Sequence, residues 1–112
     1  MATINAPFGA VDAQTILAAG TDGAKTISNQ YTSITCVAAL TGNVALAITV
    51  GSEVKAGAIL QLVAIMNGTE TITFSGSIVA PVITGSAGKT VAQTFMYNGT
   101  NFYPCGAKIQ VN

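Results

Sequence analysis

Large apolar residues alternate with small or polar residues along much of the chain, a pattern typical of β-strands that bury one face. The clearest example is the segment 44–50, where Val44, Leu46, Ile48 and Val50 alternate with Ala and Thr. Gly, Asn and Asp recur between such segments and predict turns. Short strands separated by regular turns are typical of a sandwich or a barrel. We therefore expect a single all-β domain, either a β-sandwich or a barrel-like antiparallel sheet.

One strand of this set is apolar on both faces. Residues 58–66 and 69–75 flank Asn67-Gly68, a dipeptide that suits a type I′ turn and predicts a hairpin. In the first of these strands only Gln61 interrupts the apolar run. A strand at the surface of a monomer should instead alternate apolar with polar. The strand is therefore either covered by another layer or in contact with a neighbouring chain, and its candidate interface residues are Ile59, Leu60, Leu62, Val63, Ile65 and Met66.

Further strands follow from the same pattern with weaker signals. Residues 31–37 and 77–84 predict strands, and Pro81 makes the second an edge strand or a bulge. Residues 12–19 fit a strand or a short helix, and the β-rich composition favours the strand. We expect an N-terminal arm over residues 1–12 and the β domain over 13–112.

A second hairpin is expected near the C-terminus. Residues 90–97 predict a strand that turns at Asn98-Gly99 and returns through residues 101–103. Aromatic residues cluster on this hairpin, and such a cluster is more often the packed end of a β core or a contact between subunits. Exposed rings can also stack on sugars. The corresponding alternative is a glycan-binding surface formed by Tyr97, Phe102 and Tyr103.

The charge content is unusually low and excludes several functions. Of 112 residues, 50% are hydrophobic and 7% are charged, with four Lys balancing four acidic residues and no His. Disordered chains and nucleic-acid binders both need more charge than this. Without His, the commonest general base and metal ligand is missing. We expect no enzymatic activity, no catalytic residues, no metal and no cofactor.

The acidic residues fall in separate predicted turns, so no pair of carboxylates is expected to act together. We expect Asp22 to serve as a turn residue before Gly23, and Glu53 with Lys55 to form an exposed ion pair. Glu70 is expected to face solvent or a neighbouring chain.

The sequence near Met1 has no basic segment followed by an apolar run, so we expect no secretory signal. The most apolar window of the chain, residues 56–66, is too short to span a membrane. A soluble chain assembled in the cytoplasm follows from these two features. Cys36 and Cys105 lack nearby partner ligands, and we expect buried free thiols, with a disulfide as the alternative.

Self-association is the expected outcome of so little surface charge. A monomeric protein usually carries many more charged side chains and a net charge, which keep it dispersed. A closed homo-oligomer, for which we expect a trimer, would bury the excess apolar surface. The N-terminal arm could extend over a neighbour, with Ile4, Pro7 and Phe8 as its candidate contact residues.

The second hairpin, Thr94-Phe-Met-Tyr-Asn-Gly-Thr-Asn-Phe-Tyr103, resembles a pattern found in β-rich virion proteins of tailed bacteriophages. Tail-fibre and head-fibre modules often end in a strand, a Tyr-Asp/Asn-Gly-Thr turn and an aromatic pair. Residues 57–74 are similar to the companion hairpin of those modules, and the two stretches cover about a third of the chain. Phe102 stands where these modules usually have Trp.

This resemblance implies a structural protein on the surface of a phage particle. Its partners would be copies of itself and the major capsid protein or another virion protein. The leading hypothesis is a protein that decorates and stabilises the capsid. The alternative is a receptor- or glycan-binding fibre tip, which requires the aromatic side chains of the second hairpin to be exposed.

Overall fold

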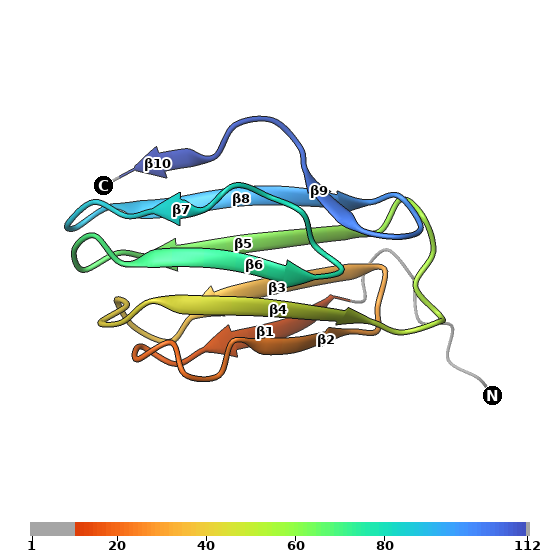
Figure 1. Ribbon diagram of the computed structural model, residues 1–112, viewed down its shortest axis with the longest axis horizontal. Coiled ribbons are helices and arrows are strands. Elements are labelled where there is room, and N and C mark those ends of the chain that lie inside the picture. The colour runs from red at the N-terminus through yellow and green to blue at the C-terminus, as the bar shows by residue number, and fades with distance from the viewer. Residues whose placement is uncertain (1–10, 112) are drawn as a thin grey trace.

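The computed structural model describes residues 11–111, which form ten strands and no helix (Figure 1). The strands are β1 (Asp12–Ile16), β2 (Ala24–Ile27), β3 (Tyr31–Cys36), β4 (Val44–Val50), β5 (Ile59–Ile65), β6 (Thr71–Gly76), β7 (Ile83–Thr84), β8 (Thr90–Tyr97), β9 (Phe102–Pro104) and β10 (Ile109–Val111). The all-β prediction is therefore confirmed. In this described part of the chain there is no helix that could cross a membrane.

The first six strands alternate between two sheets. β1, β3 and β5 lie in one sheet and pair in parallel, while β2, β4 and β6 lie in the other and also pair in parallel. Asp12 pairs with Thr32, and Thr32 in turn pairs with Leu60, so one circuit of the chain separates neighbouring strands. The first half of the protein is thus a short solenoid of three stacked coils.

The last four strands close this solenoid with antiparallel pairs. β8 joins β5 in the first sheet, and both β9 and β10 pair with the far side of β8. β7 is a short edge strand beside β6. The result is a six-stranded sheet and a four-stranded sheet, both mixed in strand direction and both open at their edges.

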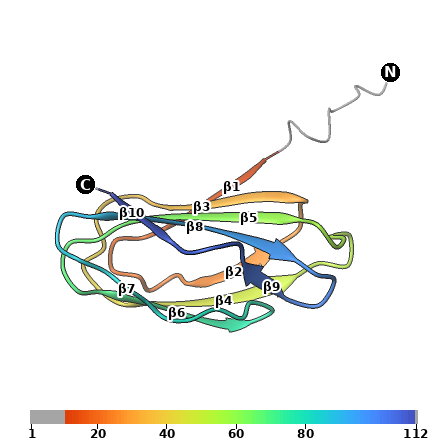
Figure 2. The same ribbon diagram turned by 90° about the horizontal axis from the view of Figure 1, so that it is seen from above.

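The two sheets lie one over the other and enclose a single apolar core (Figure 2). Alternate residues of each long strand point into it, and the strands around the middle of both sheets contribute most. The largest fully buried side chains include Phe95, Phe102, Ile34, Leu46 and Leu60. Phe74 and Phe95 bridge the sheets with an edge-to-face ring contact, their centroids 5.5 Å apart. Close packing of this kind gives the fold its main stabilising term.

The expected antiparallel arrangement is wrong for the first half of the molecule, and the sheet does not close into a barrel. In particular, β5 and β6 do not form a hairpin, because they belong to different sheets. Neither Asn67 nor Gly68 has the positive φ that a type I′ turn requires. The Glu70 carboxylate instead accepts hydrogen bonds from the backbone N–H groups of both residues, at 3.1 and 2.7 Å. This turn carries the chain from one sheet to the other.

The second hairpin is confirmed, since β8 and β9 pair antiparallel with Tyr97 opposite Phe102. Gly99 adopts φ +99°, and the Asn98 side chain accepts hydrogen bonds from the N–H groups of Thr100 and Asn101, both at 2.9 Å. A glycine at the first position of a two-residue hairpin loop is typical of a type II′ turn.

The strand predicted over residues 44–50 is confirmed with the same bounds, and those predicted over 12–19 and 31–37 are confirmed with shorter bounds. Only Ile83 and Thr84 of the predicted strand 77–84 belong to a strand, and Pro81 lies outside it at the sheet edge. β1 begins at Asp12, which the expected boundary had placed in the arm.

Candidate interaction surface

The outward-facing side chains of the six-stranded sheet form rows that cross its strands. In the first row Tyr31 pairs with Ile59, Ile59 with Met96, and Met96 with Tyr103. Residues directly opposite each other in a sheet share a face, so these four side chains are neighbours. Tyr31, Met96 and Tyr103 are exposed, and Ile59 is half-buried.

A second apolar row lies farther along the same strands. Val63 pairs with Ala92, and Ala92 pairs with Ile109. Ile65 and Val111 follow beside Thr90. Between the two rows runs a polar row of Ser33, Gln61 and Thr94. We call these three rows the six-stranded outer face.

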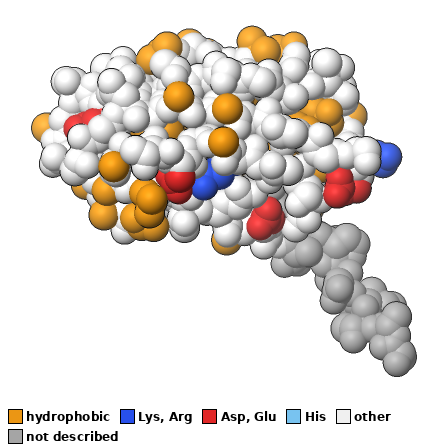
Figure 3. Space-filling model, turned by 60° about the horizontal axis from the view of Figure 1, so that its bottom comes forward, with side chains coloured by type: hydrophobic (Ala, Val, Ile, Leu, Met, Phe, Trp, Pro, Cys, Tyr) orange, Lys and Arg blue, Asp and Glu red, His pale blue; other side chains and the backbone are white. Residues whose placement is uncertain are grey.

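The six-stranded outer face carries no charged side chain. Every described strand residue that points to this side is apolar, a hydroxyl residue or Gln. The large apolar side chains on it are substantially exposed: Val63 by 37%, Ile65 by 40%, Met96 by 48% and Ile109 by 62%. Figure 3 views the molecule mainly from its β1–β2 edge and not onto this face; charged groups are few there, and one acidic and one basic group lie in contact.

A shallow hollow of about 150 Å³ interrupts this face over β3 and β5. Tyr31, Ile59 and Gln61 line it from the outer face, together with Val11 and Ser33. Met96 and Tyr103 lie on the far side of Ile59 from β3. The face therefore combines a depression with side chains that stand out from its surface.

The predicted interface residues of β5 separate into two groups. Ile59, Val63 and Ile65 point to the six-stranded outer face. Leu60, Leu62 and Met66 do not, because they are at most 1% exposed in the core between the sheets, and their assignment to an interface is wrong. Ile4, Pro7 and Phe8 lie outside the described residues.

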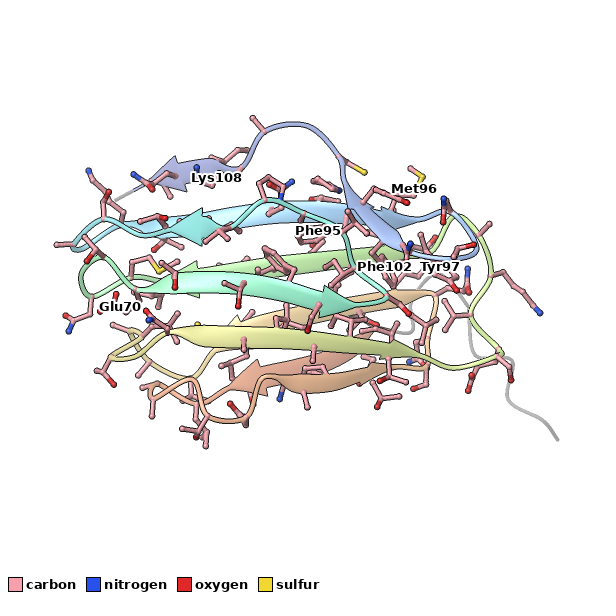
Figure 4. All side chains as sticks on the ribbon, viewed as in Figure 1. Glu70, Phe95, Met96, Tyr97, Phe102 and Lys108 are labelled. Atoms are coloured by element: carbon pink, nitrogen blue, oxygen red, sulfur yellow. The ribbon has the colours of Figure 1, made fainter. Side chains whose placement is uncertain are left out.

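The aromatic side chains of the β8–β9 hairpin are also divided. Phe102 is fully buried and Tyr97 is 8% exposed, and their rings pack together with centroids 4.9 Å apart. Figure 4 labels Tyr97 and Phe102, and also Phe95 and Met96, which lie on β8 together with Tyr97. Only Tyr103 of the three predicted sugar contacts is exposed, at 41%. The prediction of an exposed aromatic groove is therefore wrong, because two of its rings complete the core.

A cleft of about 330 Å³ opens where the two sheets diverge near β7 and β10. Phe74 and Phe95 line it, and Gln93 donates hydrogen bonds to the carbonyls of Thr94 and Gly106 at 3.0 and 3.2 Å. Lys108 is among its lining residues. No local sequence pattern indicates this cleft, because segments distant along the chain form it.

Asp22, Lys25 and Glu70 are charged groups that stabilise local turns. Asp22 accepts a hydrogen bond from the Leu17 N–H at 2.9 Å and pairs with Lys25 at 3.5 Å. The Leu17 hydrogen bond lowers the pKa of Asp22, burial opposes this effect, and the charge of Lys25 adds to it. Asp22 is thus the turn residue that was predicted. Glu53 and Lys55 form no salt bridge with each other, so that predicted pair is wrong.

Glu70 was expected to face solvent or a neighbour, and this expectation is corrected by its two hydrogen bonds to the turn at residues 67–68. The two cysteines are free. Cys36 is half-buried, which raises the pKa of its thiol, whereas Cys105 is exposed and not buried as expected.

No group of three or more His, Cys, Asp or Glu side chains that could hold a metal ion occurs among residues 11–111. The feature of this molecule with the clearest chemical character is therefore its uncharged, partly apolar outer face.

No protein-family model, curated protein or solved structure matches the chain.

Proposed function

We propose that this chain is a structural protein of a tailed-bacteriophage particle, where it decorates and stabilises the capsid. The observation that carries the proposal is the six-stranded outer face, which exposes large apolar side chains and no charge. Such a surface suits permanent contact with other protein better than a free life in solution. The resemblance of the β8–β9 hairpin to phage virion modules indicates the kind of particle.

The mechanism would be mechanical. Oligomerisation would bury part of the apolar surface, and docking on the shell would bury more. Each buried square ångström of apolar surface contributes about 25 cal/mol, so contacts shared between neighbouring shell subunits would resist their separation.

Two measurements test the proposal. The first is the solution mass of the purified chain by light scattering across a dilution series. A constant mass near a small multiple of 11.2 kDa is the expected result. A monomer at all micromolar concentrations would remove the self-assembly step.

The second measurement addresses the particle. Intact phage particles from a culture that carries the gene are banded in a density gradient and analysed by quantitative mass spectrometry. Peptides of this chain should band with the particles and remain with tailless heads. Their absence from the particle band, with the chain present in the unbanded supernatant, would overturn the assignment to a virion.

A further inference from the structure

We infer that the six-stranded outer face is the surface on which a second copy of this chain packs. This inference rests on the proposed function, because it identifies where the self-association occurs. The molecule offers two broad faces of strands, and they differ in a way that makes one of them the contact.

The electrostatics of the face favour a copy of itself over a charged partner. Two copies of an uncharged surface bring no like charges together, and neither copy has to lose the hydration of an ion. A partner recognised through charge would find no group on this face to pair with. Gln61, Ser33 and Thr94 remain available in the middle row for hydrogen bonds across the contact.

The residue pattern of β5 gives a second reason. β5 lies between β3 and β8 in the middle of the six-stranded sheet. The core covers the inner face of these strands, but no element of the described residues covers the outer one. β5 has the two-sided apolar pattern of a strand that is covered on both sides.

The size of the face is near the lower limit for a specific contact between two copies, and its relief permits a close fit. Five strands about 4.8 Å apart, and about 23 Å long where β5 spans its seven residues, cover up to about 550 Å². At full overlap two such faces would together bury at most about 1,100 Å², close to the lower limit of about 1,000 Å² expected of a biological interface. The hollow beside Tyr31 and the projecting Met96 occupy different parts of the face, so rotation can place one over the other.

The four-stranded sheet provides the matched alternative surface. Its outward side chains are small or carry hydroxyls, as at Ala45, Thr49 and Thr73. No large apolar side chain of β4 or β6 is exposed there. Little apolar area would be gained by covering this face.

The test compares Val63→Lys with Thr49→Lys. Both positions are β-branched, exposed and central in their sheets, so the two substitutions place the same charge on opposite outer faces. Val63→Lys should weaken association at least about 100-fold, because its ammonium group would be buried without a partner. The Thr49→Lys variant should form assemblies with the same number of copies as the unmodified chain. Circular dichroism and thermal unfolding establish that each variant is folded.

Met96→Lys is a second variant, on a different strand of the same face, for use if Val63→Lys does not fold. Oxidation by peroxide gives a further readout: Met96 should react more slowly in the assembled protein than in the dispersed Val63→Lys variant. If the unmodified chain is oligomeric, and both face variants keep its mass while Thr49→Lys disperses it, the inference is wrong and the proposed self-assembly stands. If the unmodified chain is monomeric, both fail.

Discussion

The two outer faces of this protein are built from the same strand alternation but present different chemistry. The six-stranded outer face exposes Ile, Val, Met and Tyr side chains, whereas the outer face of the four-stranded sheet exposes Ala, Thr and Ser. In both sheets the core is formed by the inward side chains and not by the outward ones. The difference shows that the apolar residues on one side exceed what the core requires, and this excess is the basis of the proposed assembly.

Both faces are almost free of charge, but they differ in exposed apolar area. A difference in association between them would therefore come from apolar area and not from charge. Low charge alone would make both faces equally adhesive. The comparison therefore predicts that changes to apolar area on one side alter assembly, while changes elsewhere alter only the stability of the fold. Four predictions follow this distinction, in order of decreasing expected effect.

The largest expected effect is a loss of folding stability, and it should distinguish the inward-facing from the outward-facing side chains of β8. Phe95→Ala should lower the free energy of unfolding by about 3–5 kcal/mol, because it removes a fully buried ring from between the sheets. Met96→Ala, at the next residue, should change the stability of the monomer by less than about 0.5 kcal/mol and weaken association instead. Urea denaturation at concentrations where the chain is dispersed measures the first quantity, and light scattering the second. Equal losses of stability would mean that the two side chains do not face opposite sides.

The second-largest loss of folding stability is expected at Gly76, where the backbones of two strands of the four-stranded sheet approach closely. Gly76 adopts φ +78°, and an added Cβ would collide with the Ile48 carbonyl oxygen of the adjacent strand. Gly76→Ala should therefore destabilise the fold by at least about 2 kcal/mol. Gly88→Ala is the control, because Gly88 has φ +74° but open space around its Cβ position, and should cost about 1 kcal/mol.

Thermal unfolding of both glycine variants gives the comparison. Similar losses at the two positions would show that positive φ, and not the close approach of Gly76 to β4, dominates. Neither variant should change the mass of the assembled protein, since neither residue lies on the six-stranded outer face.

A smaller effect, of opposite sign, is expected in the core. The Thr32 hydroxyl is buried and is the one such side-chain atom of the described residues without a hydrogen-bond partner. Thr32→Val should stabilise the monomer by about 1 kcal/mol, because it removes a desolvated hydroxyl group. Assembly should not change, since this side chain points away from the six-stranded outer face. A loss of stability in urea would indicate that the hydroxyl has a partner in solution.

The smallest effect is the pH dependence contributed by Asp22. Its pKa in the folded chain is lowered, so its contribution to stability is present above the unfolded pKa, about 3.9, and is lost as pH falls through the lower folded value. Asp22→Asn should cost a fraction of a kcal/mol at neutral pH, and the difference should vanish in strong acid. Urea denaturation at neutral and acidic pH measures it. A difference that persists in strong acid would show that the carboxylate charge is not the cause.

Local pattern predicted much of the secondary structure and little of its pairing. The alternation in residues 44–50 and the turn at Asn98–Asn101 involve neighbours along the chain, and both were predicted. The Asn67-Gly68 turn was misassigned because the same dipeptide serves a crossover between sheets when Glu70 holds its N–H groups. The two-sided apolar character of β5 was the available signal for parallel pairing.

The candidate surface was predictable only in part for a similar reason. Sequence alone identified β5 as a strand with an unusual outer face, but could not say which of its faces turned outward. Register decides that question, because a shift by one residue exchanges the two faces. Tyr31, Met96 and Tyr103 join Ile59 through pairing between segments far apart in the chain, and no local signal connects them.

The sequence by itself determined that this protein is all-β and has too few charges to cover its surface as a dispersed monomer usually does. Those properties depend on composition and on contacts between near neighbours in the chain. Only the tertiary structure decided that consecutive strands alternate between two sheets, that Tyr97 and Phe102 are buried, and that most of the exposed large apolar side chains lie on one face. These outcomes depend on long-range pairing, in which each strand's partner is set by the packing of the whole core.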